Sequence, residues 1–143
     1  MTDKSINSSK LQVTSYESMS NAIGALLLNE QYSDVILRVD GSDEKFFGHR
    51  QILAAFSPVF SQMLYGPFVE GSKREISLGL IDPDVFKSLL EYIYTGCVEL
   101  NIKNMVPLIG LVQQFCITAA ETEFFNAARQ LIEELGTSDS AIN

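Results

Sequence analysis

His49 is the only histidine in the chain, and its type makes it the one candidate general base near neutral pH. It stands between an expected strand and an expected helix, where Asp34 and Arg50 could approach each other. Catalysis would also need a nucleophile or a metal beside the imidazole, and no spacing in the sequence provides one. The sequence therefore predicts that His49 is a packed residue bonded to the backbone. It predicts an ordinary surface pair for Asp34 and Arg50.

The sequence motifs of common catalytic and metal sites are missing. There is no phosphate-binding glycine loop, no nucleophile elbow and no H-E-x-x-H helix. Cys97 and Cys116 form no C-x-x-C pair, and with a single histidine they are too widely spaced for a zinc site. We expect two buried free thiols, no metal and no cofactor, and an enzyme of unknown type is the least favoured hypothesis.

Length and charge limit the function further. A chain of 143 residues fits one domain, and 46% apolar with 20% charged residues is typical of a globular domain rather than a disordered one. Eighteen acidic against ten basic residues give a net charge of −8, which opposes nucleic-acid binding. The longest apolar stretch, 22–28, is shorter than the about 20 residues of a membrane span. No signal-peptide pattern is present, so we expect an intracellular protein, cytoplasmic or nuclear, without membrane contact.

Hydrophobic periodicity predicts an α+β domain, with a small sheet flanked by helices. Cap-then-proline pairs at Ser57-Pro58 and Asp82-Pro83 mark helix starts, and Gly96 marks a helix end. The expected helices are 19–27, 52–64 broken at Ser57, 83–95, 105–116 and 118–135, and the expected strands are 35–39, 45–47, 75–78 and 97–100. We expect a domain over 16–135, a loose tail over 1–15 with a possible strand at 11–14, and a polar, frayed tail over 136–143.

The segment 65–71 places Tyr65, Phe68 and Val69 between glycine and proline residues. Apolar side chains on such a loop either fold back onto the core or form a protein-contact patch. The residue types alone leave both possibilities open.

Several stretches together resemble the BTB/POZ domain family. The matching stretches are 32–35 (YSDV), 46–50 (FFGHR), 52–60 (ILAAFSPVF), 82–86 (DPDVF) and 89–96 (LLEYIYTG). The resemblance covers residues 18–134 and implies the BTB/POZ fold, a helical cluster flanked by a small mixed β-sheet. It also implies protein–protein interaction rather than catalysis.

The resemblance implies a homodimer joined through the first helix. The residues at these positions are Met19, Ala22, Ile23, Leu26 and Leu27. In some members an N-terminal strand is exchanged, which would be 11–14 here. An amphipathic helix outside the core also needs a surface to cover it, and its own subunit is the alternative to a partner. In related repressors an acid and a base at the positions of Asp34 and Arg50 form a charged pocket at the dimer interface.

Many members also bind cullin-3 as substrate adaptors of a ubiquitin ligase. Their signature is an apolar residue, any residue and a glutamate after the third helix, and Phe68-Val69-Glu70 fits it. Gln62, Met63 and Tyr65 are expected to widen this surface, which in the family also reaches the helices after Asn104. The substrate would be recruited by a domain absent from this chain.

Four departures from the family pattern bear on cullin affinity: Gly48, Pro67, the segment 113–117 and the missing cysteine in the last helix. The competing interpretation is a BTB module for assembly or corepressor docking without cullin.

Overall fold

The computed structural model describes the backbone of residues 9–67 and 73–142, with side chains described as far as residue 136. A three-stranded sheet has the order β2-β1-β3, made of β2 (Phe46–Gly48), β1 (Val35–Arg38) and β3 (Glu75–Ser77). β1 pairs antiparallel with β2 and parallel with β3, with Leu37 opposite both Phe46 and Ile76. The predicted α+β class with a small mixed sheet is therefore confirmed.

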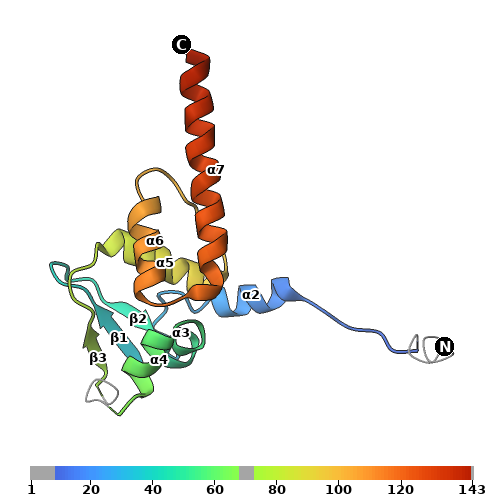
Figure 1. The fold of residues 1–143 in the computed structure, drawn as a ribbon. Coiled ribbons are helices and arrows are strands. Elements are labelled where there is room, and N and C mark those ends of the chain that lie inside the picture. The colour runs from blue at the N-terminus through green and yellow to red at the C-terminus, as the bar shows by residue number, and fades with distance from the viewer. Residues whose placement is uncertain (1–8, 68–72, 143) are drawn as a thin grey trace.

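Six helices surround this sheet in the described part of the chain (Figure 1). They are α2 (Tyr16–Gly24), α3 (Arg50–Phe56), α4 (Pro58–Tyr65), α5 (Pro83–Thr95), α6 (Met105–Gln114) and α7 (Thr118–Ile142). Figure 1 shows α7 extending away from the body of the domain, while the chain before α2 runs outward in another direction.

The helix boundaries follow from capping chemistry. Ser57 ends α3 and caps α4, because its hydroxyl accepts the Phe60 N–H at 3.0 Å. The carboxylate of Asp82 accepts the N–H groups of the first turn of α5. Gly96 ends that helix at φ 75°, a left-handed conformation that glycine adopts without a Cβ clash. The two helix starts and the helix end predicted from these residues are confirmed.

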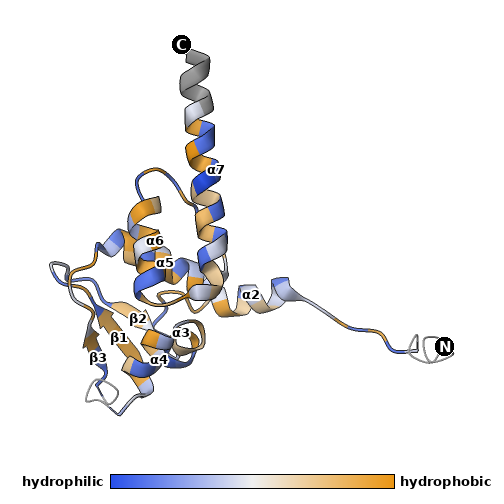
Figure 2. Ribbon diagram, in the orientation of Figure 1, coloured by the Kyte–Doolittle hydropathy of each residue, from blue (hydrophilic) through white to orange (hydrophobic). Residues whose placement is uncertain are grey.

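Aromatic rings join the sheet to the helices in the core. Phe46 meets Phe86 edge to face at 5.1 Å between ring centroids, and Phe60 stacks on Phe115 at 4.6 Å. The buried Ser57 hydroxyl also donates to the Phe115 carbonyl at 2.6 Å, which ties the α3–α4 junction to the end of α6. Figure 2 shows hydrophobic residues concentrated on the strands and on α6, while hydrophobic and hydrophilic residues alternate along the coloured part of α7.

The structure corrects the prediction of a strand at 97–100, because these residues are irregular. Side chains compete for the backbone groups that a strand would use. The Thr95 hydroxyl bonds the backbone of Cys97, and the Asn104 amide donates to the Glu99 carbonyl at 2.9 Å.

The prediction that both thiols are buried is also wrong, since Cys97 and Cys116 are exposed. Cys97 follows the left-handed Gly96 as the chain leaves α5. Cys116 sits at φ 55° in the turn between α6 and α7. Both residues lie where the chain changes direction at the surface.

The two ends of the domain also differ from the expectation. α2 ends at Gly24, so Leu26 and Leu27 lie on the turns after it rather than on the helix. α7 continues through residues 136–142, where the sequence predicts a polar tail. Residues 11–14 form no strand in this single chain, and Leu11 and Val13 are fully exposed.

Candidate functional site

His49 is buried at the N-terminus of α3, between α5 and the segment before β1. Its Nε2 lies 2.9 Å from the Gln31 carbonyl, which can only accept, so Nε2 carries the proton. Nδ1 then accepts the Tyr94 O–H at 2.8 Å, and the Tyr94 oxygen accepts the His49 backbone N–H at 3.0 Å. Both ring nitrogens are therefore occupied, and the prediction of a packed histidine bonded to the backbone is confirmed.

The Tyr94 hydroxyl is held in its neutral form by this environment. Burial raises the pKa of Tyr94 to about 12, the nearby Asp34 charge adds to the rise, and the amide donor of His49 opposes it. Among the described residues, no group of three or more His, Cys, Asp and Glu side chains could hold a metal ion. What the site offers chemically is a closed hydrogen-bond network that fixes the chain around residue 31.

Asp34 and Arg50 do approach each other, as the sequence predicts. The Asp34 carboxylate accepts the Arg50 backbone N–H at 2.8 Å, and Arg50 Nε donates to the Asp34 carbonyl at 3.3 Å. The guanidinium reaches further, since Nη1 donates to the Leu64 carbonyl at 3.0 Å and Nη2 donates to the Lys73 carbonyl. Arg50 is thus more than half of a surface pair, because its bonds connect α3 with the end of α4 and with Lys73, just before β3.

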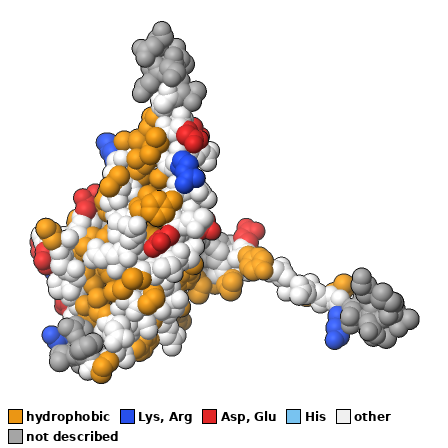
Figure 3. All heavy atoms as spheres, viewed as in Figure 1, with side chains coloured by type: hydrophobic (Ala, Val, Ile, Leu, Met, Phe, Trp, Pro, Cys, Tyr) orange, Lys and Arg blue, Asp and Glu red, His pale blue; other side chains and the backbone are white. Residues whose placement is uncertain are grey.

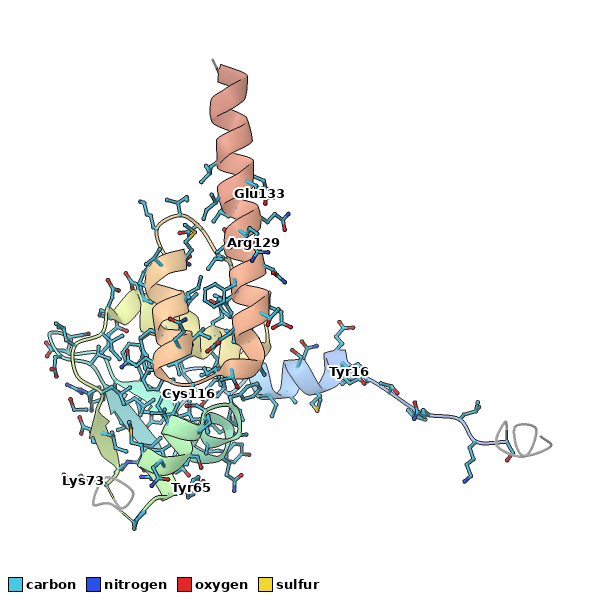
Figure 4. The ribbon with its side chains drawn as sticks, in the orientation of Figure 1. Tyr16, Tyr65, Lys73, Cys116, Arg129 and Glu133 are labelled. Atoms are coloured by element: carbon cyan, nitrogen blue, oxygen red, sulfur yellow. The ribbon has the colours of Figure 1, made fainter. Side chains whose placement is uncertain are left out.

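The face of α2 is shared between the core and the surface. Ile23, Leu26 and Leu27 are half-buried against the core, whereas Met19 and Ala22 are exposed. A groove of about 280 Å³ runs between α2, Phe56 and the end of α5. The Ser20 hydroxyl closes one side of it by donating to the Thr95 carbonyl at 3.0 Å. The exposed Tyr16 ring begins this helix (Figure 4).

The end of α4 carries the described part of the predicted cullin surface. Gln62 and Tyr65 are exposed, and Met63 is half-buried against the core. Figure 4 places Tyr65 and Lys73 at the same end of the molecule. Phe68, Val69 and Glu70 lie outside the described residues. The structure therefore places Gln62 and Tyr65 where a partner could reach them.

A third apolar surface was not singled out by the sequence analysis. Val106 on α6 is 70% exposed, and Phe125 and Ile132 on α7 are 43% and 55% exposed. These residues line a groove of about 420 Å³ between the two helices. Figure 3 shows hydrophobic side chains gathered beside α7, the helix at the top of the view. Two features of the sequence could have indicated this surface. The helix α6 carries no charged residue, and α7 carries more apolar residues than one helix face can bury.

None of the described helices is long and apolar enough to cross a bilayer. The exposed features are apolar helix faces beside neutral grooves, and the buried His49–Tyr94 network is fully hydrogen-bonded. Exposed apolar helix faces of this kind are typical of an α+β protein-interaction module.

Comparison with known proteins identifies the kind of module. The family model for the BTB/POZ domain matches residues 23–130, and the chain belongs to this family of protein-interaction modules. Kelch-like protein 40 of Xenopus tropicalis is 34% identical over 73% of this chain. BTB/POZ domain-containing protein 9 of Drosophila melanogaster is 36% identical over 75% of it. The chain spans only 17% and 15% of the length of these two relatives.

Solved structures agree with this assignment. The BTB domain of human gigaxonin superposes with a TM-score of 0.64 and 25% identity, covering 82% of this chain and 96% of that one. The BTB domain of zebrafish PATZ1 gives the same TM-score of 0.64 at 22% identity, which supports the fold alone.

Proposed function

We propose that this BTB domain homodimerises and binds the N-terminal domain of cullin-3 as a substrate adaptor of a ubiquitin ligase. The observation that carries the proposal is the exposed Tyr65 ring at the end of α4, three residues before the start of the apolar-x-Glu sequence 68–70. Gln62 is exposed on the same helix. Phe68 would fill an apolar pocket of the cullin, and Glu70 would accept N–H groups at a helix N-terminus or within its own loop.

The dimer interface in this proposal is the exposed side of α2. Met19 is 61% exposed there, and Tyr16 and Ala22 are exposed beside it. An apolar helix face of this kind is stabilised when a two-fold partner covers it with the same face. Asp34 and Arg50 would complete the interface through the family's charged pocket. The half-buried Ile23, Leu26 and Leu27 would belong to the interface as well and would pack it against the core of each protomer. The exposed segment 11–14 would exchange between protomers.

A dimer would give the ligase two identical arms. Two linked binding sites raise the effective concentration of a bound substrate without any new contact. The substrate itself would be recruited by a domain outside this chain, and the BTB domain would contribute no catalytic group and no cofactor.

Light scattering after gel filtration tests both parts of the proposal. We expect a dimer mass for the chain alone and a two-to-two complex when the cullin-3 N-terminal domain is added. Phe68→Ala combined with Glu70→Ala should abolish the complex and leave the dimer intact. A dimer that ignores the cullin would support assembly or corepressor docking instead, and a stable monomer would remove the interface assigned to α2.

A further inference from the structure

We propose that a second copy of this chain docks in the groove between α6 and α7, with its own α7 lying antiparallel in it. The groove has a volume of about 420 Å³, and the residues of the two helices that line it are all uncharged. None of these lining residues belongs to α2 or to α4. The inference therefore goes beyond the proposed function and does not depend on it.

The outer part of α7 has no surface to cover it within a single chain. Ala128 is the last buried residue in the described part of this helix, and residues 132–136 are all exposed. Ile132 and Leu135 lie in this exposed part, and Figure 1 shows α7 extending away from the body of the domain. Helices in proteins owe most of their stability to the packing of an apolar face, so this part of α7 is expected to pack on a partner.

The apolar residues on this side of α7 are complementary to themselves. Four of them follow one another at spacings of three, four and three residues, as in helices that pair along a seam: Phe125, Ala128, Ile132 and Leu135. A two-fold axis at the level of Gln130, the middle residue of α7, brings Ala128 opposite Ile132 of the second copy. The same axis brings Phe125 opposite Leu135. Each layer then joins a smaller to a larger side chain, which lets the two helices interdigitate.

The charges beside this seam favour the antiparallel arrangement. Arg129 and Glu133 lie one turn apart along α7, as Figure 4 shows. In the antiparallel pair, Arg129 of each copy lies within one helical turn of Glu133 of the other copy. A parallel pair would instead place like charges side by side at both positions. Because the groove has no charged lining residue, a strongly charged partner would find no counter-charge inside it.

Gly110 on α6 is also explained by a neighbour from outside the chain. It lines the groove in the interior of a helix, where glycine is less favourable than alanine. A Cβ atom added to it would meet nothing within 4 Å, so the packing of the chain itself does not require glycine here. The missing side chain allows the backbone of a second helix to approach α6 closely, because the side chains at a contact set the distance between packed helices.

Sedimentation equilibrium on the full chain, at concentrations up to millimolar, tests the proposal. The contact is small, so it should form at concentrations above those of gel filtration. Ile132→Glu and Gly110→Leu should each weaken this association about tenfold or more. Gly110→Leu has open space in its own chain and a better helix former, so it should fold at least as stably as wild type while it blocks the groove. The matched control is Leu80→Glu, which changes an 89% exposed residue outside the groove and should leave the association unchanged.

Disulfide trapping tests the antiparallel arrangement. Ala128→Cys and Ile132→Cys are made separately in a chain that also carries Cys97→Ser and Cys116→Ser. A disulfide needs Cα atoms about 4.4–6.8 Å apart, so a mixture of the two variants should cross-link much faster than either variant alone. Faster cross-linking of each variant with itself would mean a parallel pair and would overturn the proposal, as would the absence of any cross-link.

Failure of this inference and failure of the proposed function give different results. A dimer that Met19→Glu abolishes and Ile132→Glu leaves unchanged at every concentration would overturn the groove contact and support the α2 interface. An association that Ile132→Glu abolishes and Met19→Glu leaves unchanged would support the groove contact and refute the α2 interface. Wild-type protein that shows no groove-dependent association up to millimolar concentration would leave the groove to a helix other than a second copy and would overturn the proposal.

Discussion

Replacing Tyr94 with phenylalanine should destabilise the fold far more than the loss of one hydroxyl suggests. The Tyr94 oxygen accepts the His49 N–H at 3.0 Å and its proton goes to His49 Nδ1 at 2.8 Å. Tyr94 is 2% exposed and His49 is 6% exposed, so water cannot readily replace the hydroxyl. Tyr94→Phe therefore leaves one buried donor and one buried acceptor without partners.

The size of the effect follows from these two orphaned groups. A buried polar group left unsatisfied costs about 1–3 kcal/mol, and the variant no longer has to desolvate its own hydroxyl. We therefore expect a loss of about 2–4 kcal/mol, which is a large share of the about 5–15 kcal/mol that stabilises a typical domain. With a urea m-value of about 2 kcal/mol per M, in the middle of the usual range, the unfolding midpoint should fall by about 1–2 M.

Urea unfolding followed by circular dichroism measures this loss. Wild type and variant are compared at one protein concentration, because dimerisation would make stability depend on concentration. Tyr32→Phe is the matched control, since Tyr32 is 78% exposed and its change should stay within about 0.5 kcal/mol. A Tyr94→Phe midpoint equal to that of the control would refute the claim that the hydroxyl completes a buried network.

Four further outcomes are expected. The pKa of Tyr94 is about 12 in the folded state against an ordinary 10.0, so the folded state keeps this proton to higher pH and the free energy of unfolding should fall between pH 10 and 12. Over this pH range the urea midpoint should fall less steeply in Tyr94→Phe than in wild type, and equal slopes would contradict this assignment. Ser57→Ala should cost about 1–3 kcal/mol in urea unfolding, since its buried hydroxyl serves two backbone partners. The control Ser42→Ala removes a half-buried hydroxyl that accepts only the Glu44 N–H, and it should cost clearly less. Both Cys97 and Cys116 should react with a thiol reagent in the native state. A cysteine that reacts only after denaturation would contradict the exposed position given to it here. Met19→Glu should convert the proposed dimer to a folded monomer in light scattering, and a persistent dimer would place the interface elsewhere.

Residues that begin and end helices made much of the fold predictable. Ser57-Pro58, Asp82-Pro83 and Gly96 act on the backbone within one turn, so their effect can be read without tertiary structure. The strand predicted at 97–100 failed because the outcome depended on the Asn104 side chain, which takes the Glu99 carbonyl from five residues away.

The candidate site was less predictable because its contacts cross the chain. That Asp34 and Arg50 approach each other was foreseen from their positions beside the hairpin. The bonds from Arg50 to the carbonyls of Leu64 and Lys73 join residues 14 and 23 positions apart, and main-chain carbonyls carry no sequence signal. Likewise, Phe125 and Ile132 fit a helical core pattern, and only the packing of α6 and α7 shows that they stay exposed.

Two adjacent residues connect the surfaces proposed for the α2 dimer and for cullin to one point of the fold. His49 is bonded to Tyr94, which lines the groove beneath α2. Arg50 is bonded to the end of α4, beside the exposed Tyr65. Both residues lie at the junction of β2 and α3, where the backbone N–H of each is fixed by a side chain from elsewhere in the chain. A dimer partner and a cullin would therefore bind surfaces whose relative orientation is set by this junction.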